Sequence, residues 1–310
     1  MINNLFIFIV ALSVVIKGAT LATKYSAALA ESYRLSQYTA GFIIVAVISI
    51  LPEMFISINA ALKGIPSFGL GMLFGSNIAD LTLVFAIITL FAGRELKIES
   101  KILKNHAVYP CILLLPLILG LDGRYTRPEG IALIMVGVVF YYVVLKNGID
   151  GTVPPNTKRS NTYASLAMLF VGMAILLAGA HFTVVSATSL AHYFEVSPIL
   201  IGMLIVGLGT TMPELFFSLK SARQRDDSLA IGDILGIVLA DATIVVGILA
   251  LISPFSFPQK IIYITGMFMV AASFMLFRFM RSGRMLSKRE AYMLVIFWLA
   301  FVLVEFIANT

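Results

Sequence analysis

Four acidic residues stand inside otherwise apolar stretches of the 310-residue sequence, where an ionisable side chain is costly and is by default functional. Two of them, Glu53 and Glu214, each follow a proline. The other two, Asp80 and Asp241, each follow an alanine. Carboxylate oxygens are the ligands that hard cations prefer. The four acids therefore indicate a cation site. Pairing with buried bases is disfavoured, because Lys17 is the only basic residue inside an apolar stretch.

The prolines before the two glutamates predict further oxygen ligands. Pro52 and Pro213 have no N–H, so a helix that contains them leaves the carbonyls of Ile48 and Gly209 without their usual partner. In a membrane, such a carbonyl needs protein, water or an ion to satisfy it. Hydroxyl groups also flank both glutamates, and they are Ser49, Thr210 and Thr211.

The composition places these residues in a membrane protein. Hydrophobic residues make up 60% of the sequence and charged residues only 12%, whereas a soluble domain carries about a quarter charged residues. The apolar stretches are each about 20 residues long, which is enough to cross a bilayer as a helix. We therefore expect an all-α polytopic membrane protein with about ten transmembrane helices. The expected spans are 3–24, 39–63, 68–93, 105–121, 129–145, 163–191, 198–221, 228–252, 260–280 and 288–308.

The two halves of the sequence match at a constant offset of 161 residues. Both the Pro-Glu pairs and the Ala-Asp pairs fall in this register. Five expected helices lie in each half, so the second half must enter the membrane from the opposite side. This predicts two inverted repeats, residues 1–146 and 162–310, joined by a linker at 147–161, with the site at the midplane where the halves meet. Other matched pairs are Ser57 with Ser218, Gly71 with Gly232, and Gly75 with Gly236.

The Lys and Arg residues are unevenly distributed among the connections. Most of the 22 lie in alternate connections, which include the linker. Because basic residues favour the cytoplasmic side, we expect a multi-pass cell-membrane protein with both termini outside and the linker in the cytoplasm. The net charge of +6 is thus a topology signal, and it does not indicate nucleic-acid binding.

Two charged residues have roles that the sequence leaves open. Lys17 lies deep in the first expected span, where it is a candidate to neutralise an aspartate. Asp233 has no acidic counterpart, because Met72 occupies the matching position in the first half. It can be read as a ligand, a proton carrier or a residue at a helix end.

The motifs around the four acids resemble the two alpha-repeats of the calcium/cation antiporter superfamily, and in particular small prokaryotic Na⁺/Ca²⁺ exchangers. The motifs are VISILPE at 47–53, GSNIAD at 75–80, GTTMPE at 209–214 and GIVLAD at 236–241. They fall in alpha-repeats at about 41–85 and 202–246. The resemblance implies a secondary active antiporter without a cofactor and without enzymatic activity. It would exchange Ca²⁺ for a monovalent cation, with Na⁺ favoured over H⁺ and K⁺.

The resemblance also assigns roles to individual residues. It implies that Glu53 and Glu214 are the two central Ca²⁺ ligands and that both also take part in Na⁺ binding. The carbonyls that would complete the shell belong to Ala46, Ser49, Gly207 and Thr210. An outer cation site of the family matches Ser76, Gly207, Thr210, Thr211 and Glu214.

The sequence departs from the family pattern on the side expected to face the cytoplasm. Ile50 and Ile237 stand where that cation site usually has hydroxyl groups, and Ile48 replaces a glycine. Asp80 replaces a residue that is commonly asparagine in sodium exchangers. We therefore expect fewer Na⁺ ions per cycle, with a proton from an aspartate, or K⁺, taking up the difference.

Two other functions use similar residues. A conductive cation channel or uniporter also places carboxylates in a pore, but it needs no inverted pair of gates. An intramembrane aspartyl protease also holds two buried aspartates. That class shows a Tyr-Asp and a Gly-x-Gly-Asp pairing, whereas this sequence has Ala-Asp at both Asp80 and Asp241.

Overall fold

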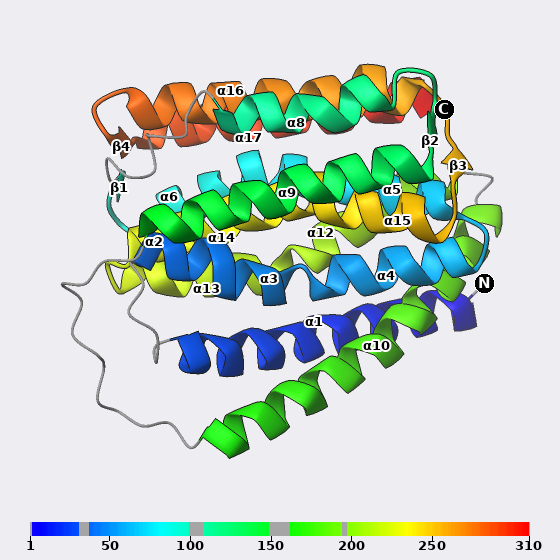
Figure 1. Ribbon diagram of the computed structural model, residues 1–310, viewed down its shortest axis with the longest axis horizontal. Helices are drawn as coiled ribbons and strands as arrows, with labels where there is room; N and C mark the ends of the chain where they lie inside the picture. Colours follow the sequence, from blue (N-terminus) through cyan, green and yellow to red (C-terminus); the bar gives the residue numbers. More distant parts are fainter. Residues whose placement is uncertain (1, 31–36, 99–107, 149–161, 194–196, 310) are drawn as a thin grey trace.

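The computed structural model describes residues 2–30, 37–98, 108–148, 162–193 and 197–309, and nearly all of them form helices that lie side by side (Figure 1). In this part of the chain six helical segments are long and apolar enough to cross a membrane. These segments are Pro66–Phe91, Arg127–Lys146, Pro198–Arg223, Asp227–Ile252, Ile261–Arg281 and Lys288–Ala308. Shorter apolar helices are Leu5–Gly18, Leu51–Leu62 and Val108–Leu119. The predicted helical architecture, with several helices long and apolar enough to cross a membrane, is therefore confirmed.

The first half includes two long rods, each made of consecutive helices, whose α-helical hydrogen-bond pattern is interrupted by a π-helical stretch. α1 spans Ile2–Ala30, α8 spans Val108–Leu119 and α9 spans Arg127–Gly148. The first interrupted rod comprises α2 (Gln37–Thr39), the π-helix η1 (Ala40–Val45), α3 (Ala46–Ser49) and α4 (Leu51–Leu62). The second comprises α5 (Pro66–Ala79), the π-helix η2 (Asp80–Val84) and α6 (Phe85–Phe91).

The second half repeats this order of elements. α10 spans Thr162–Tyr193 and α17 spans Lys288–Asn309. The first interrupted rod comprises α11 (Pro198–Ile201), η3 (Gly202–Val206), α12 (Gly207–Thr210) and α13 (Met212–Arg223). The second comprises α14 (Asp227–Ala240), η4 (Asp241–Val245) and α15 (Val246–Ile252), and it is followed by η5 (Ile261–Gly266) with α16 (Met267–Arg281). Most of the predicted linker, from residue 149 to 161, lies outside the described residues.

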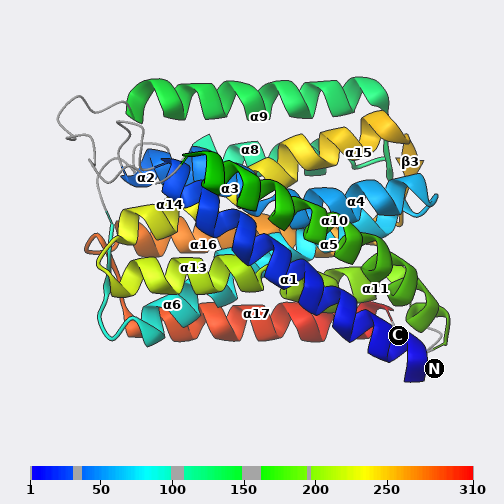
Figure 2. The same ribbon diagram turned by 90° about the horizontal axis from the view of Figure 1, so that it is seen from below.

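The interrupted rods occupy the middle of the molecule. α8, α16 and α17 lie on one side of them, and α1 and α10 lie on the opposite side (Figure 1). α1 runs beside α10, oblique to the remaining helices (Figure 2). Both chain termini lie at one end of the molecule, whereas α10 begins at the opposite end (Figure 1). The middle rods are therefore shielded on two sides by helices with long apolar surfaces.

Two short antiparallel strand pairs join connections that belong to different halves. β1 (Leu96–Lys97) pairs with β4 (Met285–Leu286), and β2 (Arg124–Tyr125) pairs with β3 (Phe255–Ser256). The two pairs lie at opposite ends of the molecule (Figure 1). Each end is thus held by backbone hydrogen bonds between the first and second halves.

The middle rods cross at glycines, where their backbones nearly touch. A Cβ atom placed on Gly75 of α5 would lie 2.3 Å from the carbonyl oxygen of Met203 in η3. A Cβ atom on Gly236 of α14 would lie 2.5 Å from the carbonyl oxygen of Phe42 in η1. These two contacts are related by the offset of 161 residues. Small residues allow such close approach of helices in membranes. The rod that contains α5 is thereby packed against the second-half rod that carries Glu214. The rod that contains α14 is packed against the first-half rod that carries Glu53.

A salt bridge fastens the end of the molecule that carries β1 and β4. The guanidinium of Arg94 donates to both carboxylate oxygens of Asp227, at 2.6 and 2.7 Å, and also to the carbonyl of Ala222 at 2.7 Å. The backbone N–H of Lys97 donates to the same carboxylate at 2.9 Å. The hydrogen bond with Asp227 raises the pKa of Arg94 above its already high value. Asp227 is buried, so these donors take the place of water around its carboxylate.

We expect Arg94→Ala to destabilise the protein by about 1–2 kcal/mol, because it leaves the buried Asp227 carboxylate with fewer donors. The expected loss of stability is modest, because the Arg94 side chain is 31% exposed and solvent partly screens its charge. The thermal midpoint of the purified protein measures the change. Arg124→Ala, which removes an exposed salt bridge to Asp122, is the control and should leave the midpoint unchanged. Equal midpoints for both variants would contradict a structural role for the Arg94 pair.

Candidate cation site

The two glutamates stand just after matching interruptions of their helices. α3 ends at Ser49 and α4 begins at Leu51, and the intervening Ile50 has φ −70° and ψ −8°. In the second half Thr211 separates α12 from α13 with φ −75° and ψ −6°. The prolines occupy the first turns of α4 and α13, where their missing N–H costs nothing. Glu53 and Glu214 lie in the same first turns, where the helix dipole favours negative charge.

The two aspartates open the π-helical stretches of the second rods. Asp80 is the first residue of η2 and Asp241 is the first residue of η4. π-helical turns are rare and are frequent at functional sites. The hydroxyl of Thr82 donates to the carbonyl of Ile78, and Thr243 makes the equivalent bond in the other half. The aspartates are thereby held at equivalent places in the two halves.

All four carboxylates are sealed from solvent, with exposed fractions of 1% or less. Both carboxylate oxygens of Glu214 and both of Asp241 lack a hydrogen-bond partner, as do one oxygen of Glu53 and one of Asp80. No Lys or Arg side chain forms a salt bridge with any of them within the described residues. Glu53 lies close enough to the other three for their charges to repel. Buried, unpaired and mutually repelling carboxylates are stabilised by a bound cation.

The predicted hydroxyl ligands of the outer site are buried. Ser76 of α5 donates to the carbonyl of Leu73 at 3.0 Å, and Thr211 donates to that of Leu208 at 2.9 Å. Thr210 lies beside Glu53. A Cβ atom on Gly207 would lie 3.1 Å from the backbone nitrogen of Ser76, so this glycine allows α12 to approach α5. The predicted outer-site residues are thus brought together from two separate rods.

Two of the predicted carbonyl ligands take part in helix hydrogen bonds in this conformation. The carbonyl of Ala46 accepts from the N–H of Ile50 at 3.0 Å. The carbonyl of Gly207 accepts from the N–H of Thr211 at 3.2 Å and from the hydroxyl of Thr210 at 2.9 Å. A carbonyl oxygen has two lone pairs. A cation at Gly207 would therefore have to displace the Thr210 hydroxyl.

On the side of the glutamates that is expected to face the cytoplasm, the two positions that carry hydroxyl groups in the family pattern are apolar here, as the sequence indicates. Ile50 is 5% exposed and Ile237 is 1% exposed. Ser49, next to Ile50, is buried and its hydroxyl has no hydrogen-bond partner. Ala46 packs close to Gly236, so this part of α3 lies against α14. Two side chains that would offer oxygen in the family pattern offer only hydrocarbon here.

Lys17 is not placed to neutralise one of the aspartates. Lys17 is exposed on α1, whereas the aspartates are buried within the middle rods. α1 turns Val15 toward α10, where Gly179 packs against it, and this orientation directs Lys17 outward. Depth along a helix could be read from the sequence, but the face that the side chain occupies could not. The charge of the four acids is therefore not offset by this amine.

Two tyrosines that were not predicted from the sequence donate hydrogen bonds to α14, the helix that leads to Asp241. Tyr109 of α8 donates its hydroxyl to the carbonyl of Leu235 at 2.7 Å, and Tyr141 of α9 donates to that of Gly236 at 2.8 Å. Both side chains are buried and fix the middle of α14. A tyrosine in an apolar helix is ordinarily a packing residue, so no sequence pattern distinguished these two.

Another missed residue is Glu305 of α17, which is 2% exposed and accepts a hydrogen bond from Thr265 of η5. Thr265 in turn donates to the sulfur of Met203 in η3 at 3.8 Å, so Glu305 lies behind the rod that carries Glu214. It has no matching acid 161 residues earlier, where Val144 stands, so the repeat gave no signal for it.

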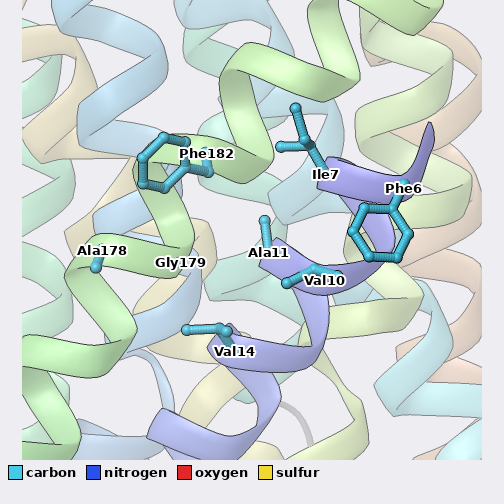
Figure 3. Close-up of a pocket in the computed structure, with 8 residues that line it drawn as sticks. All are labelled: Phe6, Ile7, Val10, Ala11, Val14, Ala178, Gly179 and Phe182. Carbon is cyan, nitrogen blue, oxygen red and sulfur yellow. The ribbon is translucent and has the colours of Figure 1, made fainter. Parts of the chain in front are cut away.

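The carboxylates do not form a compact metal cluster, and a nearby cavity is unrelated to them. Within the described part of the chain no three His, Cys, Asp or Glu side chains converge on one point. A cavity of about 370 Å³ lies between α1 and α10, but its lining is wholly apolar (Figure 3). Phe6, Val10, Ala178 and Phe182 are among its lining residues, and none is a predicted ligand.

Comparisons with known proteins point to one family. The model of the sodium/calcium exchanger protein family matches residues 3–146 and again residues 164–307. The putative antiporter CaxA of Alkalimonas amylolytica is 30% identical over 74% of each chain, and the inner membrane protein YrbG of Escherichia coli is 26% identical over 80% of this chain and 79% of its own. The sodium/calcium exchanger MaX1 of Methanosarcina acetivorans is 23% identical over 98% of both chains. A solved structure of the sodium-calcium exchanger NCX_Mj has the same fold, with a TM-score of 0.73, 22% identity and coverage of 96% and 97%.

Proposed function

Since the chain belongs to the sodium/calcium exchanger family, we propose that it is a secondary active antiporter that exchanges Ca²⁺ for a monovalent cation. The observation that carries this proposal is the pair Glu53 and Glu214. Each is buried, has an oxygen without a hydrogen-bond partner and stands just after a helix interruption. Two carboxylates balance one divalent ion, and flanking neutral oxygens complete its shell.

In the proposed site Glu53 and Glu214 bind Ca²⁺, and Asp80 and Asp241 provide negative charge at the π-helical turns beside them. The neutral ligands are the hydroxyls of Ser49, Ser76, Thr210 and Thr211 and the carbonyls of Ala46 and Gly207. Na⁺ is the favoured counter-ion, because one of the similar proteins is a sodium/calcium exchanger and because Ser76, Thr210 and Thr211 offer buried neutral oxygens. H⁺ and K⁺ are the alternatives that the experiment below tests.

The proposed mechanism is alternating access between two inverted five-helix repeats, residues 1–146 and 162–310, with about ten spans in all. The twofold match of the family model supports it, as do the glycine crossings that recur 161 residues apart. Inverted repeats place one gate on each side of a central site. A channel needs no such pair of gates, and the similar proteins named above include antiporters and exchangers.

The test is uptake of radioactive Ca²⁺ into proteoliposomes that contain the purified protein. Vesicles are loaded with Na⁺, K⁺ or acid in turn, and the external Ca²⁺ concentration is held constant. Antiport predicts Ca²⁺ uptake that depends on an outward gradient of one monovalent cation and reverses when that gradient is reversed. Uptake that follows only the membrane potential, whatever the monovalent cation, would instead indicate a channel.

The proposed orientation places both termini outside the cell and the linker in the cytoplasm. It rests on Arg94, which stands two residues before β1, and Arg281, which ends α16 shortly before β4, because the β1–β4 pair lies at the end of the molecule opposite the chain termini (Figure 1). We expect epitope tags at either terminus to be accessible on intact cells, and a tag between residues 150 and 161 to become accessible only after permeabilisation. A linker tag that reacts on intact cells would reverse the orientation.

A further inference from the structure

Asp233 is a fifth buried acid next to the proposed site. It lies on α14 and its exposed fraction is 0%. Neither of its carboxylate oxygens has a hydrogen-bond partner. The polar side chains beside it are Ser49 of α3 and Ser218 of α13, both buried. The hydroxyl of Ser49 also lacks a hydrogen-bond partner, and that of Ser218 makes only a long contact of 3.5 Å to the carbonyl of Ala230.

The two halves differ at this place. Position 72, which corresponds to Asp233 by the offset of 161, is a buried methionine. Asp233 stands one helical turn before Ile237 on α14, and its neighbour Ser49 directly precedes Ile50. Residues four apart on a helix share a face. The side of the site that has lost two hydroxyl ligands, one from each half, has therefore gained a carboxylate one turn away.

The surroundings of Asp233 do not supply a balancing charge. Its charge acts on those of Asp80 and Glu214, which have the same sign. No Lys or Arg forms a salt bridge with it within the described ranges. An ionised carboxylate in this environment needs a counter-charge. One carboxylate with two neutral hydroxyls matches a monovalent ion, whereas a divalent ion would keep an excess positive charge.

We propose that Asp233, together with the hydroxyls of Ser49 and Ser218, binds one Na⁺ ion on the side of the central glutamates that faces the predicted linker. This site replaces the one that Ile50 and Ile237 cannot form. The number of Na⁺ ions per cycle is then not reduced, which revises the expectation from the sequence. The inference rests on the proposed exchange function and names one counter-ion site within it.

The test compares wild type with Asp233→Asn in proteoliposomes at fixed pH. Na⁺-driven Ca²⁺ uptake is measured against internal Na⁺ concentration, and Ca²⁺/Ca²⁺ exchange is measured without Na⁺. In the variant we expect the Hill coefficient for Na⁺ to fall by about one and the half-saturating Na⁺ concentration to rise about tenfold, as for the loss of a charged ligand. Ca²⁺/Ca²⁺ exchange should stay at the wild-type rate. Asp122→Asn, the same change in an exposed connection, is the matched control.

The outcomes separate this inference from the proposed function. A wild type without Ca²⁺ exchange would refute the proposed function itself. Normal exchange with an unchanged Na⁺ dependence in Asp233→Asn would refute only the Asp233 site. Loss of Ca²⁺/Ca²⁺ exchange in a folded Asp233→Asn would also refute it, because Asp233 would then belong to the Ca²⁺ site. Exchange driven by H⁺ or K⁺ but not by Na⁺ would do the same.

If Asp233→Asn does not purify as a folded protein, Ser218→Ala provides the test. It removes one neutral ligand and leaves the buried charge in place. A rise in the half-saturating Na⁺ concentration, with unchanged Ca²⁺/Ca²⁺ exchange, would support the site. An unchanged half-saturating Na⁺ concentration would overturn it.

Discussion

Glu53→Gln and Glu214→Gln are each expected to lower Ca²⁺ exchange by about a hundredfold or more, because a neutral amide cannot balance a divalent ion that has lost its water. Each variant should nevertheless fold. Glutamine has nearly the same volume as glutamate, and it removes a buried charge that has no basic partner within the described residues. The thermal midpoint measured without Ca²⁺ should therefore stay the same or rise.

The measurement is Ca²⁺ uptake by the purified variants in proteoliposomes under the best counter-ion gradient for the wild type. Glu95→Gln, which makes the same change at an exposed glutamate, is the control and should retain full activity. Adding Ca²⁺ should raise the thermal midpoint of the control but not that of the two site variants. Undiminished uptake by Glu53→Gln or Glu214→Gln would remove that residue from the site.

Gly75→Ala and Gly236→Ala are expected to have the second large effect, on assembly of the protein. The added methyl carbon would lie 2.3 Å from a backbone carbonyl oxygen at Gly75 and 2.5 Å from one at Gly236. Backbone atoms within packed helices cannot rotate away as a side chain can, so the two rods must separate. Overpacking of a core costs about 1–3 kcal/mol, and a clash with backbone falls at the upper end of that range or beyond it.

Size-exclusion chromatography in detergent and the thermal midpoint measure this effect. We expect both variants to lose most of the monodisperse protein or to melt several degrees lower. Gly283→Ala is the control, because Gly283 lies in an exposed turn where an added Cβ would meet no atom within 4 Å. Its positive φ of 73° makes that change cost only about 1 kcal/mol. Wild-type behaviour of Gly75→Ala would show that the crossing can relax.

The sequence predicted the parts of the structure that depend on local chemistry. The Pro-Glu pairs predicted interrupted helices, and the structure breaks them at Ile50 and Thr211. Apolar length predicted the span 198–221, and the structure has helices over residues 198–223 with one interruption. Thr210 and Thr211 were predicted as oxygen ligands because they flank a Pro-Glu pair, and Ser76 because of the family resemblance. Ser76, Thr210 and Thr211 are accordingly buried in the structure.

The features that the sequence did not predict depend on the direction of a side chain or on contacts between distant helices. The outward direction of Lys17 could not be predicted, since an almost uniformly apolar helix carries no signal for its inward side. Tyr109 and Tyr141 act through carbonyls about 95 to 126 residues away in the sequence. The neighbours of Asp233 come from two other helices, so its surroundings could be read only after the rods were assembled.

The strand pair at one end of the molecule has a consequence for how the chain is made. Leu96 pairs with Leu286, so 190 residues must be synthesised after Leu96 before its partner exists. At about 5–20 residues per second, the β1 edge waits roughly 10 to 40 seconds during translation. Arg94 likewise has no partner until Asp227 has been made, 133 residues after it. The β1–β4 pair and the Arg94 salt bridge therefore form late, once the second half has been inserted and has packed against the first.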